Sequence, residues 1–257
     1  MDFKKFYEEQ PDYTGFRTDP EKRDEYIKKV GWKVNELIKV VPAGYHFENI
    51  MEIGCAMGIL LDQISTRLSI SNRFGLDISE ENIKMARLLY PESVFYSQTV
   101  EEFALKPPAG KFNLILLSDI IEHIPDDVAF LRTVGELSSF VLVNLPLEKC
   151  FKNRNRKYGE TDSSGHLRWY DKEIADALFR EAGFEIIRSF TSNSLNDNVY
   201  FGLYKKNRTE RLKKKILPLR LFWTLFYFGE DQIKNISKPL YNRIYGANYF
   251  AFLKSKK

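Results

Sequence analysis

This chain of 257 residues has few cysteines, no long apolar run and only a small excess of positive over negative charge. The two cysteines, Cys55 and Cys150, are too few for a disulfide framework or a cysteine-based zinc cluster, so we expect a reducing compartment and no metal site. No run reaches the roughly 18 apolar residues that a membrane-spanning helix needs. The net charge of +4 is small, so composition gives no argument for nucleic-acid binding. Residues 1–6 are charged and lack the apolar centre of a signal peptide, so we expect cytoplasmic localisation.

The stretch Asn49–Leu61 combines a short apolar strand, a glycine-marked turn and the start of a helix. Gly54 and Gly58 flank the turn, where glycine lets the backbone adopt positive φ and approach a ligand. Asp77 ends the next apolar run, and a carboxylate at that place can accept hydrogen bonds from both hydroxyls of a ribose. We therefore expect an α/β domain that binds a nucleoside.

Two nucleoside cofactors compete for this pattern, a dinucleotide such as NAD and S-adenosylmethionine. Dinucleotide sites favour Gly-x-Gly-x-x-Gly, whereas this turn reads Gly54-Cys-Ala-Met-Gly58 and follows an acid, Glu52. The acid and the spaced glycines resemble the first motif of the class I S-adenosylmethionine-dependent methyltransferases. The resemblance implies that the cofactor is contacted by Glu52, Gly54, Cys55, Ala56 and Gly58. A Rossmann oxidoreductase that uses NAD is the disfavoured alternative.

The segment around Asp77 resembles the second motif of the same family. The resemblance implies that Asp77 holds the ribose and that Ile78 packs against the adenine. Family members usually carry an acid after the third strand, where it holds the adenine amino group. This chain reads Gln98-Thr99-Val-Glu101 there, so the hydrogen bond would fall to Gln98, to Thr99 or to the backbone. Alternatively, these residues begin a short helix.

An unbroken apolar run at 112–117 predicts a parallel strand that is buried on both faces. It continues as Ser118-Asp119-Ile-Ile-Glu-His123-Ile-Pro, which closely resembles the Leu-Glu-His-(Ile/Leu)-Pro signature of small-molecule methyltransferases, including those of quinone biosynthesis. The resemblance implies that Ser118 and Asp119 line the cofactor. It also implies that His123 lies near the transferred methyl group, as a base or as a structural support. A His-Leu-Arg segment often borders the acceptor pocket in this family, which makes His166 the second candidate base.

The apolar run at 140–144 predicts the fifth strand. The following Asn144–Leu147 segment resembles only faintly the Asn/Asp-Pro-Pro-aromatic motif of methyltransferases that act on amino groups of DNA bases, because it lacks the second proline. We interpret this segment as a loop after the strand.

The leading segment is aromatic, and we expect residues 1–18 to be irregular. A helix then begins at the Asp19 cap, which is followed by a proline. In related methyltransferases such a segment often covers the cofactor, which implies Tyr7, Tyr13 or Arg17 at the methionine end. Simple packing on the sheet is the alternative for each of these residues.

The seventh strand of the class I sheet is delayed in this chain, and we expect it at 248–253. The insertion before it has a basic part, 205–215, and an apolar aromatic part, 216–228. This combination suits a membrane interface or a lipid-linked acceptor. A lid or a dimer contact that packs on the body is the alternative.

Together these patterns predict an α/β fold, a Rossmann-like seven-stranded and mostly parallel sheet with an antiparallel last strand and helices on both faces. We expect a cap at 1–48, a core at 49–190 and 247–257, and an insertion at 191–246. The predicted function is transfer of a methyl group from S-adenosylmethionine to oxygen or carbon of a small-molecule, glycan or lipid-linked acceptor. The alternative is a non-catalytic family member that binds the cofactor as a scaffold. We further expect contact with the membrane surface through 205–228, or a homodimer.

Overall fold

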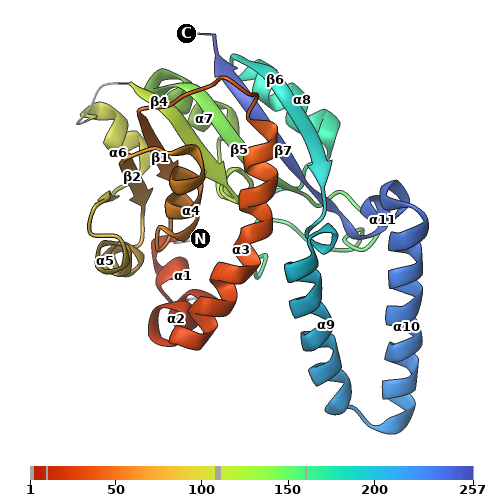
Figure 1. Ribbon diagram of the computed structural model, residues 1–257. Coiled ribbons are helices and arrows are strands. Elements are labelled where there is room, and N and C mark those ends of the chain that lie inside the picture. The colour runs from red at the N-terminus through yellow and green to blue at the C-terminus, as the bar shows by residue number, and fades with distance from the viewer. Residues whose placement is uncertain (1–2, 10, 108–110, 160, 257) are drawn as a thin grey trace.

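A single twisted sheet forms the centre of the protein (Figure 1). The computed structural model describes residues 3–9, 11–107, 111–159 and 161–256. Within these residues the sheet has seven strands in the order β3-β2-β1-β4-β5-β7-β6, with β7 antiparallel to both of its neighbours. The strands are β1 (Asn49–Ile53), β2 (Asn72–Asp77), β3 (Val94–Ser97), β4 (Phe112–Ser118), β5 (Ser138–Leu147), β6 (Phe184–Ser192) and β7 (Ala247–Ser255). The predicted fold class is confirmed.

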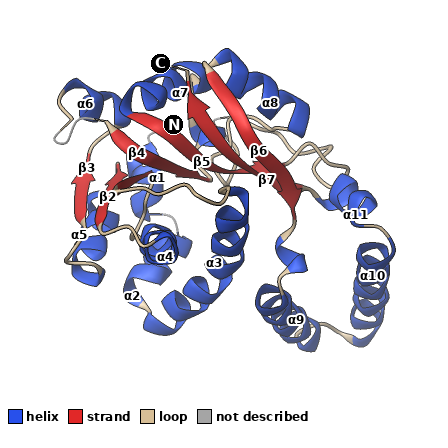
Figure 2. Cartoon of the chain, turned by 45° about the horizontal axis from the view of Figure 1, so that its top comes forward, coloured by secondary structure: helices blue, strands red, loops and turns tan. Residues whose placement is uncertain are grey.

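Helices cover both faces of the sheet (Figure 2). On one face lie α3 (Pro20–Val40), α4 (Ile59–Leu68) and α5 (Glu80–Leu89), and on the other lie α6 (Val100–Leu105), α7 (Asp127–Leu137) and α8 (Lys172–Glu181). The remaining helices are α1 (Phe3–Glu9), α2 (Pro11–Thr18), α9 (Asn198–Lys213), α10 (Leu217–Ile236) and α11 (Lys238–Tyr245), with short 3-10 turns η1 (Ile121–His123) and η2 (Ser194–Asn196).

The alternation of side chains along the strands divides the core into two layers. In β4, Leu114 and Leu116 pack with α3 and α4, whereas Ile115 and Leu117 pack with α6, α7 and α8. Successive side chains of a strand point to opposite faces, so a strand covered by helices on both sides must be apolar throughout. The unbroken apolar run in the sequence therefore identifies β4 as a central strand.

Two local predictions were wrong. Residues 3–9 and 11–18 form α1 and α2 instead of an irregular segment. These helices are too short to be stable alone and depend on their packing against α3 and α5. The segment Asn144–Leu147 is part of β5 and not a loop, because β7, which comes about a hundred residues later, pairs with it.

Helices α9 and α10 form a hairpin that projects from the body on the side where the parallel strands end (Figure 1). The hairpin starts there because β6, which leads into it, runs parallel to β5. A buried ion pair between Arg208 and Glu230 joins the two helices, and Tyr241 donates a 3.0 Å hydrogen bond to Glu230. The base of the hairpin is held to α3 by an edge contact between the rings of Trp32 and Tyr200.

Candidate functional site

The turn between β1 and α4 has a left-handed backbone at three residues, with φ of +77° at Gly54, +45° at Ala56 and +76° at Gly58. The positive φ favours glycine at position 54, and a Cβ there would also lie 2.8 Å from Cδ1 of Ile120, which would have to shift. Ala56 adopts the unfavourable conformation with a side chain. Its N–H donates a 2.8 Å hydrogen bond to Asp77, which helps to hold the turn in this shape.

Asp77 ends β2 with its carboxylate fixed by two backbone donors. Oδ2 accepts the N–H of Ala56 and Oδ1 accepts the N–H of Ser79, each at 2.8 Å. An ionised carboxylate has about four lone-pair sites, so both oxygens keep capacity for further donors. Burial raises the pKa of Asp77, and the two N–H groups oppose that rise. The site thus presents an oriented acceptor pair suited to two neighbouring hydroxyls.

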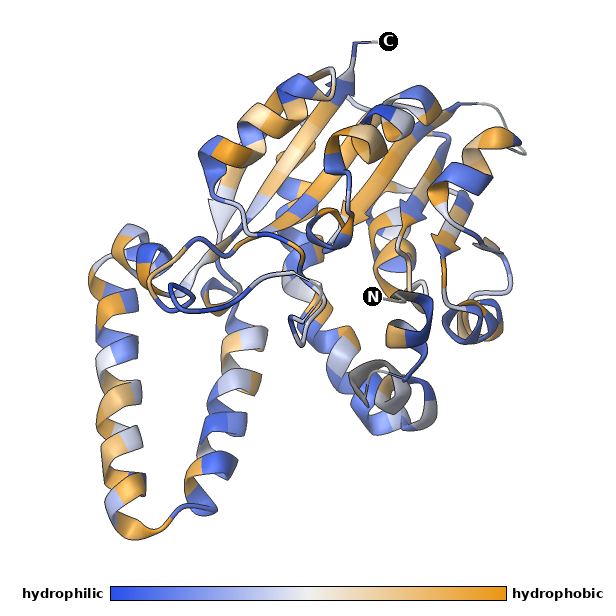
Figure 3. Cartoon of the chain, turned by 180° about the vertical axis from the view of Figure 1, so that it is seen from behind, coloured by the Kyte–Doolittle hydropathy of each residue, from blue (hydrophilic) through white to orange (hydrophobic). Residues whose placement is uncertain are grey.

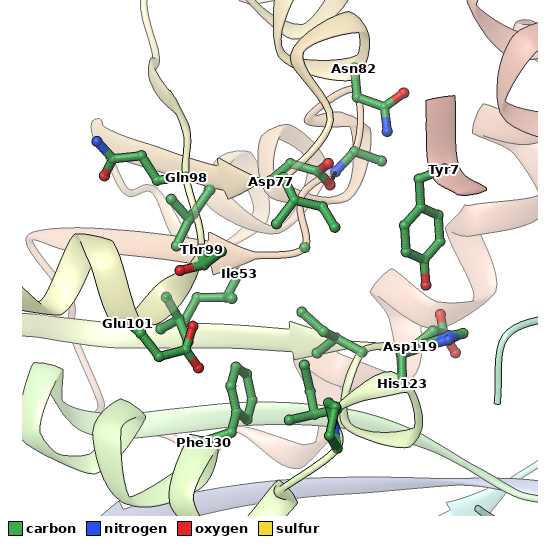
Figure 4. Close-up of a pocket in the computed structure, with 18 residues that line it drawn as sticks. Tyr7, Ile53, Asp77, Asn82, Gln98, Thr99, Glu101, Asp119, His123 and Phe130 are labelled. Carbon is green, nitrogen blue, oxygen red and sulfur yellow. Dashed lines mark hydrogen bonds between the residues drawn. The ribbon is translucent and has the colours of Figure 1, made fainter. Parts of the chain in front are cut away.

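A cavity opens at the carboxyl ends of β1, β2 and β4, the place where doubly wound sheets bind ligands. Figure 4 shows Asp77 between two chemically different ends of this cavity. At one end lie Gln98, Thr99 and Glu101, and at the other lie Tyr7, Asp119 and His123. The wall also includes Ile78, next to Asp77. One end of the cavity therefore offers an amide, a hydroxyl and a carboxylate, Asp77 lies between, and the other end offers the Asp119 carboxylate beside a phenol and an imidazole.

Gln98 and Thr99 line the cavity, and Thr99 also caps α6. Its hydroxyl accepts the N–H of Glu102 at 3.2 Å, while the Glu102 carboxylate accepts the N–H of Thr99 at 3.0 Å. The short helix that the sequence offered as the alternative is thus present, and contact of Gln98 or Thr99 with an adenine stays a prediction. Glu101 also lines this end, although the sequence analysis did not select it. Glu101 lies four residues after the end of β3, and this position could have identified it as a counterpart of the acid that family members carry after the third strand.

A smaller cavity shares the glycine turn and Asp119 with the larger one and is lined by Glu52, Cys55, Ser118 and Lys33. Glu52 is buried below the turn and accepts the N–H of Leu61 at 3.0 Å, which fixes the start of α4. Burial raises the pKa of Glu52 well above its usual range. Glu52 therefore stabilises the connection between the turn and α4.

Asp119 is held at positive φ (+53°) by polar contacts on two sides. Lys33 forms an ion pair with its Oδ2, and Asn144 donates to its Oδ1 at 3.1 Å. Burial lowers the pKa of Lys33, but Asp119, Tyr26 and Glu122 together outweigh burial and raise this pKa. The sequence analysis missed Lys33 and Asn144, because each comes from an element distant in sequence.

His123 lines the larger cavity from η1, with the ring of Tyr7 5.8 Å away. Its Nδ1 lies 2.9 Å from the carbonyl oxygen of Gly165. The ring of His166 is 4.7 Å from that of His123, and Nδ1 of His166 lies 2.6 Å from Glu148. Burial, together with His166, lowers the pKa of His123 to about 4, so its imidazole is neutral at pH 7. The structure brings both candidate histidines together.

The leading helices close one side of the cavity. Tyr7 lines it directly, whereas Arg17 supports it through a 2.7 Å hydrogen bond to Asn82, which is part of the wall. Tyr13 lies in α2, but its side chain is outside the described residues. Of the three residues that the resemblance implied, Tyr7 therefore has the most direct place at the cavity.

Known proteins resemble the chain in sequence and in fold. Residues 6–189 match the family described as "Methyltransferase domain". The ubiquinone biosynthesis O-methyltransferase of Sodalis glossinidius is 31% identical over 98 residues, which are 37% of this chain and 38% of that protein. The chain thus matches well under half the length of that relative.

Two solved structures share the fold over the whole chain. Magnesium protoporphyrin IX methyltransferase from Synechocystis PCC 6803 with bound SAH is 12% identical with a TM-score of 0.58, covering 99% of this chain and 98% of that chain. Phosphoethanolamine N-methyltransferase 2 of Haemonchus contortus with S-adenosyl-L-methionine is 13% identical with a TM-score of 0.63, covering 100% of this chain and 60% of that one. At such identities the likeness shows the fold.

Proposed function

Because the chain belongs to the methyltransferase-domain family, we propose that it transfers a methyl group from S-adenosylmethionine to an oxygen or carbon atom of a lipid-linked acceptor. The observation that carries the proposal is the larger cavity, in which the Asp77 carboxylate lies between the end with Gln98 and Thr99 and the end with Asp119. An adenosine joined to an amino acid has parts in a matching order: an adenine with an amino group, a ribose with two hydroxyls, and a charged amino acid.

S-adenosylmethionine is the cofactor, and the described residues fit it part by part. Asp77 would accept from the ribose hydroxyls, and Ile78 would pack on the adenine, whose amino group would donate to Gln98, Thr99 or Glu101. Gly54 keeps the backbone free of a side chain beside the cofactor. The pair of Lys33 and Asp119 offers one cation and one anion for the carboxylate and ammonium groups of the methionine end.

When bound, the cofactor supplies a methyl group activated by a positively charged sulfur. The protein then has to align an acceptor atom about 3 Å from that methyl group. Tyr7 and His123 lie at the end of the cavity that also contains Asp119, and they border the space for the acceptor. A neutral imidazole can accept the proton of a hydroxyl acceptor, so His123, supported by His166, is the candidate base.

The α9–α10 hairpin favours an acceptor that is presented by a membrane. Its tip carries a cluster of exposed apolar side chains, which we call the apolar tip: Ile216, Leu217, Leu219, Leu221, Phe222, Leu225, Phe226 and Phe228. Figure 3 shows the hydrophobic residues gathered along α10 and at the end of the hairpin. Three consecutive lysines, Lys213, Lys214 and Lys215, lie beside this tip. Apolar area next to positive charge matches the surface of an anionic bilayer.

The position of the hairpin connects membrane contact with catalysis. The apolar tip projects from the edge of the sheet at which the cavity opens (Figure 1). An acceptor anchored in the bilayer would therefore approach from the side of the reacting groups. Among the described residues, no helix combines the length and the apolar character needed to cross a membrane.

We expect Gly54→Ala to weaken binding of S-adenosylhomocysteine by about tenfold (about 1.4 kcal/mol), because Gly54 lines the cavity and strain at its positive φ would displace the turn from the shape that binds the cofactor. The added Cβ would also meet Ile120. Gly44→Ala is the matched control, because Gly44 has φ of +87° and nothing within 4 Å of a Cβ. Calorimetry on both variants separates the general effect of an alanine at positive φ from the effect of a side chain in the cofactor turn. Equal affinities of the two variants would contradict a cofactor role for the turn.

The acceptor proposal is tested with S-adenosylmethionine labelled in its methyl group. Purified protein is incubated with a total lipid extract, or with the water-soluble fraction, of the cells from which the protein comes. We expect label to enter the organic phase, and to be lost with Asp77→Asn. Label confined to water-soluble products would contradict a lipid-linked acceptor. Tight cofactor binding without transfer to either fraction would contradict catalysis and support the scaffold alternative.

A further inference from the structure

Glu122, His123 and His166 form a cluster next to the larger cavity, whose wall includes His123 but not the other two residues. One ligand atom from each residue lies within 4.8 Å of the other two. Nε2 of His123 is 3.9 Å from Oε1 of Glu122, too far for a hydrogen bond. The cluster joins η1, which follows β4, to the loop before α8, so distant parts of the chain converge on one point.

The hydrogen bonds of the two imidazoles fix which nitrogen carries the proton. Nδ1 of His123 faces the carbonyl oxygen of Gly165 at 2.9 Å, and a carbonyl can only accept, so Nδ1 is the protonated nitrogen. Nδ1 of His166 faces a carboxylate oxygen of Glu148 at 2.6 Å, with the same consequence. In its neutral form, each ring therefore has its lone pair on Nε2. Histidines that bind metal ions usually show this arrangement, in which a carbonyl or carboxylate accepts from the other nitrogen.

The Glu148 carboxylate is itself held in place. Its Oε1 accepts a 2.7 Å hydrogen bond from Arg156, and Arg156 also donates to both oxygens of Asp162 at 2.7 Å. This network folds the loop between β5 and α8 around His166. The orientation of the His166 ring is thus determined by a supporting layer of charged groups.

The Glu122 side chain is the strongest sign that a ligand is needed. It is only 1% exposed, and neither of its carboxylate oxygens has a hydrogen-bond partner among the described residues. A buried carboxylate without partners is costly, and a protonated one would still need an acceptor for its O–H. A cation placed between Glu122 and the two Nε2 atoms would satisfy the carboxylate.

We propose that Glu122, His123 and His166 bind a divalent transition-metal ion of the zinc class. Two imidazole nitrogens and one carboxylate are a donor set of catalytic Zn²⁺ sites, whereas Mg²⁺ and Ca²⁺ favour oxygen ligands. A modest contraction of the cluster would bring the ligand atoms to ~2.0–2.2 Å from one ion. The sequence analysis expected no metal site because it considered cysteine clusters.

Three protein ligands leave an open position on the ion, and His123 places that position at the cavity wall. There the ion would bind an acceptor oxygen and favour its deprotonated form. This role rests on the proposed function, but binding of the metal does not. In the metal-bound protein, His123 and His166 act as ligands and no longer as bases.

The test titrates the full chain, stripped with a chelator, with ZnCl2, MnCl2 and MgCl2 by calorimetry. We expect one Zn²⁺ per chain with micromolar or tighter affinity, and much weaker binding of Mg²⁺. Glu122→Gln and His166→Ala should each weaken Zn²⁺ binding by about 100-fold. His46→Ala removes the third histidine of the chain, far from the cluster in sequence, and should leave the affinity unchanged. Cys150→Ser tests zinc binding by the half-buried thiol of Cys150, and an affinity that is lost in this variant would contradict the proposed site.

Binding of S-adenosylhomocysteine is measured on the same variants in metal-free buffer. Unchanged binding there shows that the variants are folded and that the cofactor proposal holds independently of the metal. Failure of wild-type protein to bind Zn²⁺ below 100 µM (on the order of weak adventitious affinity) would overturn the metal site. Equal Zn²⁺ affinities in wild type, Glu122→Gln and His166→Ala would overturn it as well.

Discussion

Asp77→Asn is expected to weaken binding of S-adenosylhomocysteine by about 30-fold, which corresponds to roughly 2 kcal/mol. The substitution keeps the shape of the side chain but replaces one acceptor oxygen by an NH2 group. That NH2 group would face a backbone N–H of Ala56 or Ser79, and it could not accept from a ribose hydroxyl. The loss therefore combines a missing contact to the cofactor with a disturbed turn. Isothermal calorimetry on purified protein measures the change.

Glu81→Gln is the matched control for Asp77→Asn, because it removes the same charge from α5, the helix that follows Asp77. Glu81 is exposed and pairs with Lys84 at the surface. We expect cofactor affinity within twofold of wild type (about 0.4 kcal/mol). Thermal unfolding of each variant shows whether the fold is retained. If folded Asp77→Asn bound S-adenosylhomocysteine like wild type, the carboxylate would have no part in cofactor binding.

Replacing two leucines and one phenylalanine of the apolar tip by aspartate is expected to abolish membrane binding. Leu221→Asp, Leu225→Asp and Phe228→Asp alter one side of α10, since these positions are four and three residues apart. Each side chain is more than 60% exposed, so its transfer into a bilayer is worth about 1–2 kcal/mol. The triple variant should lower the partition coefficient by about 100-fold or more. Cosedimentation with vesicles of phosphatidylglycerol and phosphatidylcholine measures it.

Leu88→Asp together with Leu105→Asp is the matched control for the tip variants. Both leucines are exposed, at 74% and 87%, but they lie on α5 and α6, outside the hairpin. The control should bind vesicles like wild type. Lys213, Lys214 and Lys215 changed to glutamine should reduce binding to anionic vesicles by about 1 kcal/mol per lysine, and only at low salt.

A second copy of the chain is the alternative binding partner of the apolar tip. Sedimentation velocity distinguishes such a homodimer from a monomer that binds membranes. If the tip binds a second copy of the chain, wild type would sediment as a dimer without vesicle binding, and the triple variant would sediment as a monomer. That result would contradict the membrane proposal. The hairpin itself should stay folded in the variant, since the buried pair of Arg208 and Glu230 is retained and the altered side chains are exposed.

The parts of the site that lie close together in sequence could be predicted before the structure. The glycine turn, Asp77 and the end of β4 each follow a strand directly, so local patterns place them at one edge of a parallel sheet. Ile78, Gln98 and Thr99 were selected through the family resemblance, and all three line the cavity. Their contacts with the cofactor remain predictions, which the calorimetric variants test.

The parts that depend on distant contacts could not be predicted. Lys33 lies in an amphipathic helix where a lysine usually marks the solvent side, and only the packing of α3 brings it to Asp119. His123 and His166 were selected separately, but their meeting with Glu122 requires the loop that Arg156 holds. Short helices such as α1 and α2 have weak local signals and are stabilised by tertiary contacts.

The most direct test of the account is a calorimetric titration of the wild-type protein with S-adenosylhomocysteine and, in parallel, with NAD. We predict micromolar binding of S-adenosylhomocysteine at one site per chain and no binding of NAD. The absence of a Gly-x-Gly-x-x-Gly turn is the reason for the second expectation. Binding of NAD in place of S-adenosylhomocysteine would contradict the central claim that this cavity serves methyl transfer.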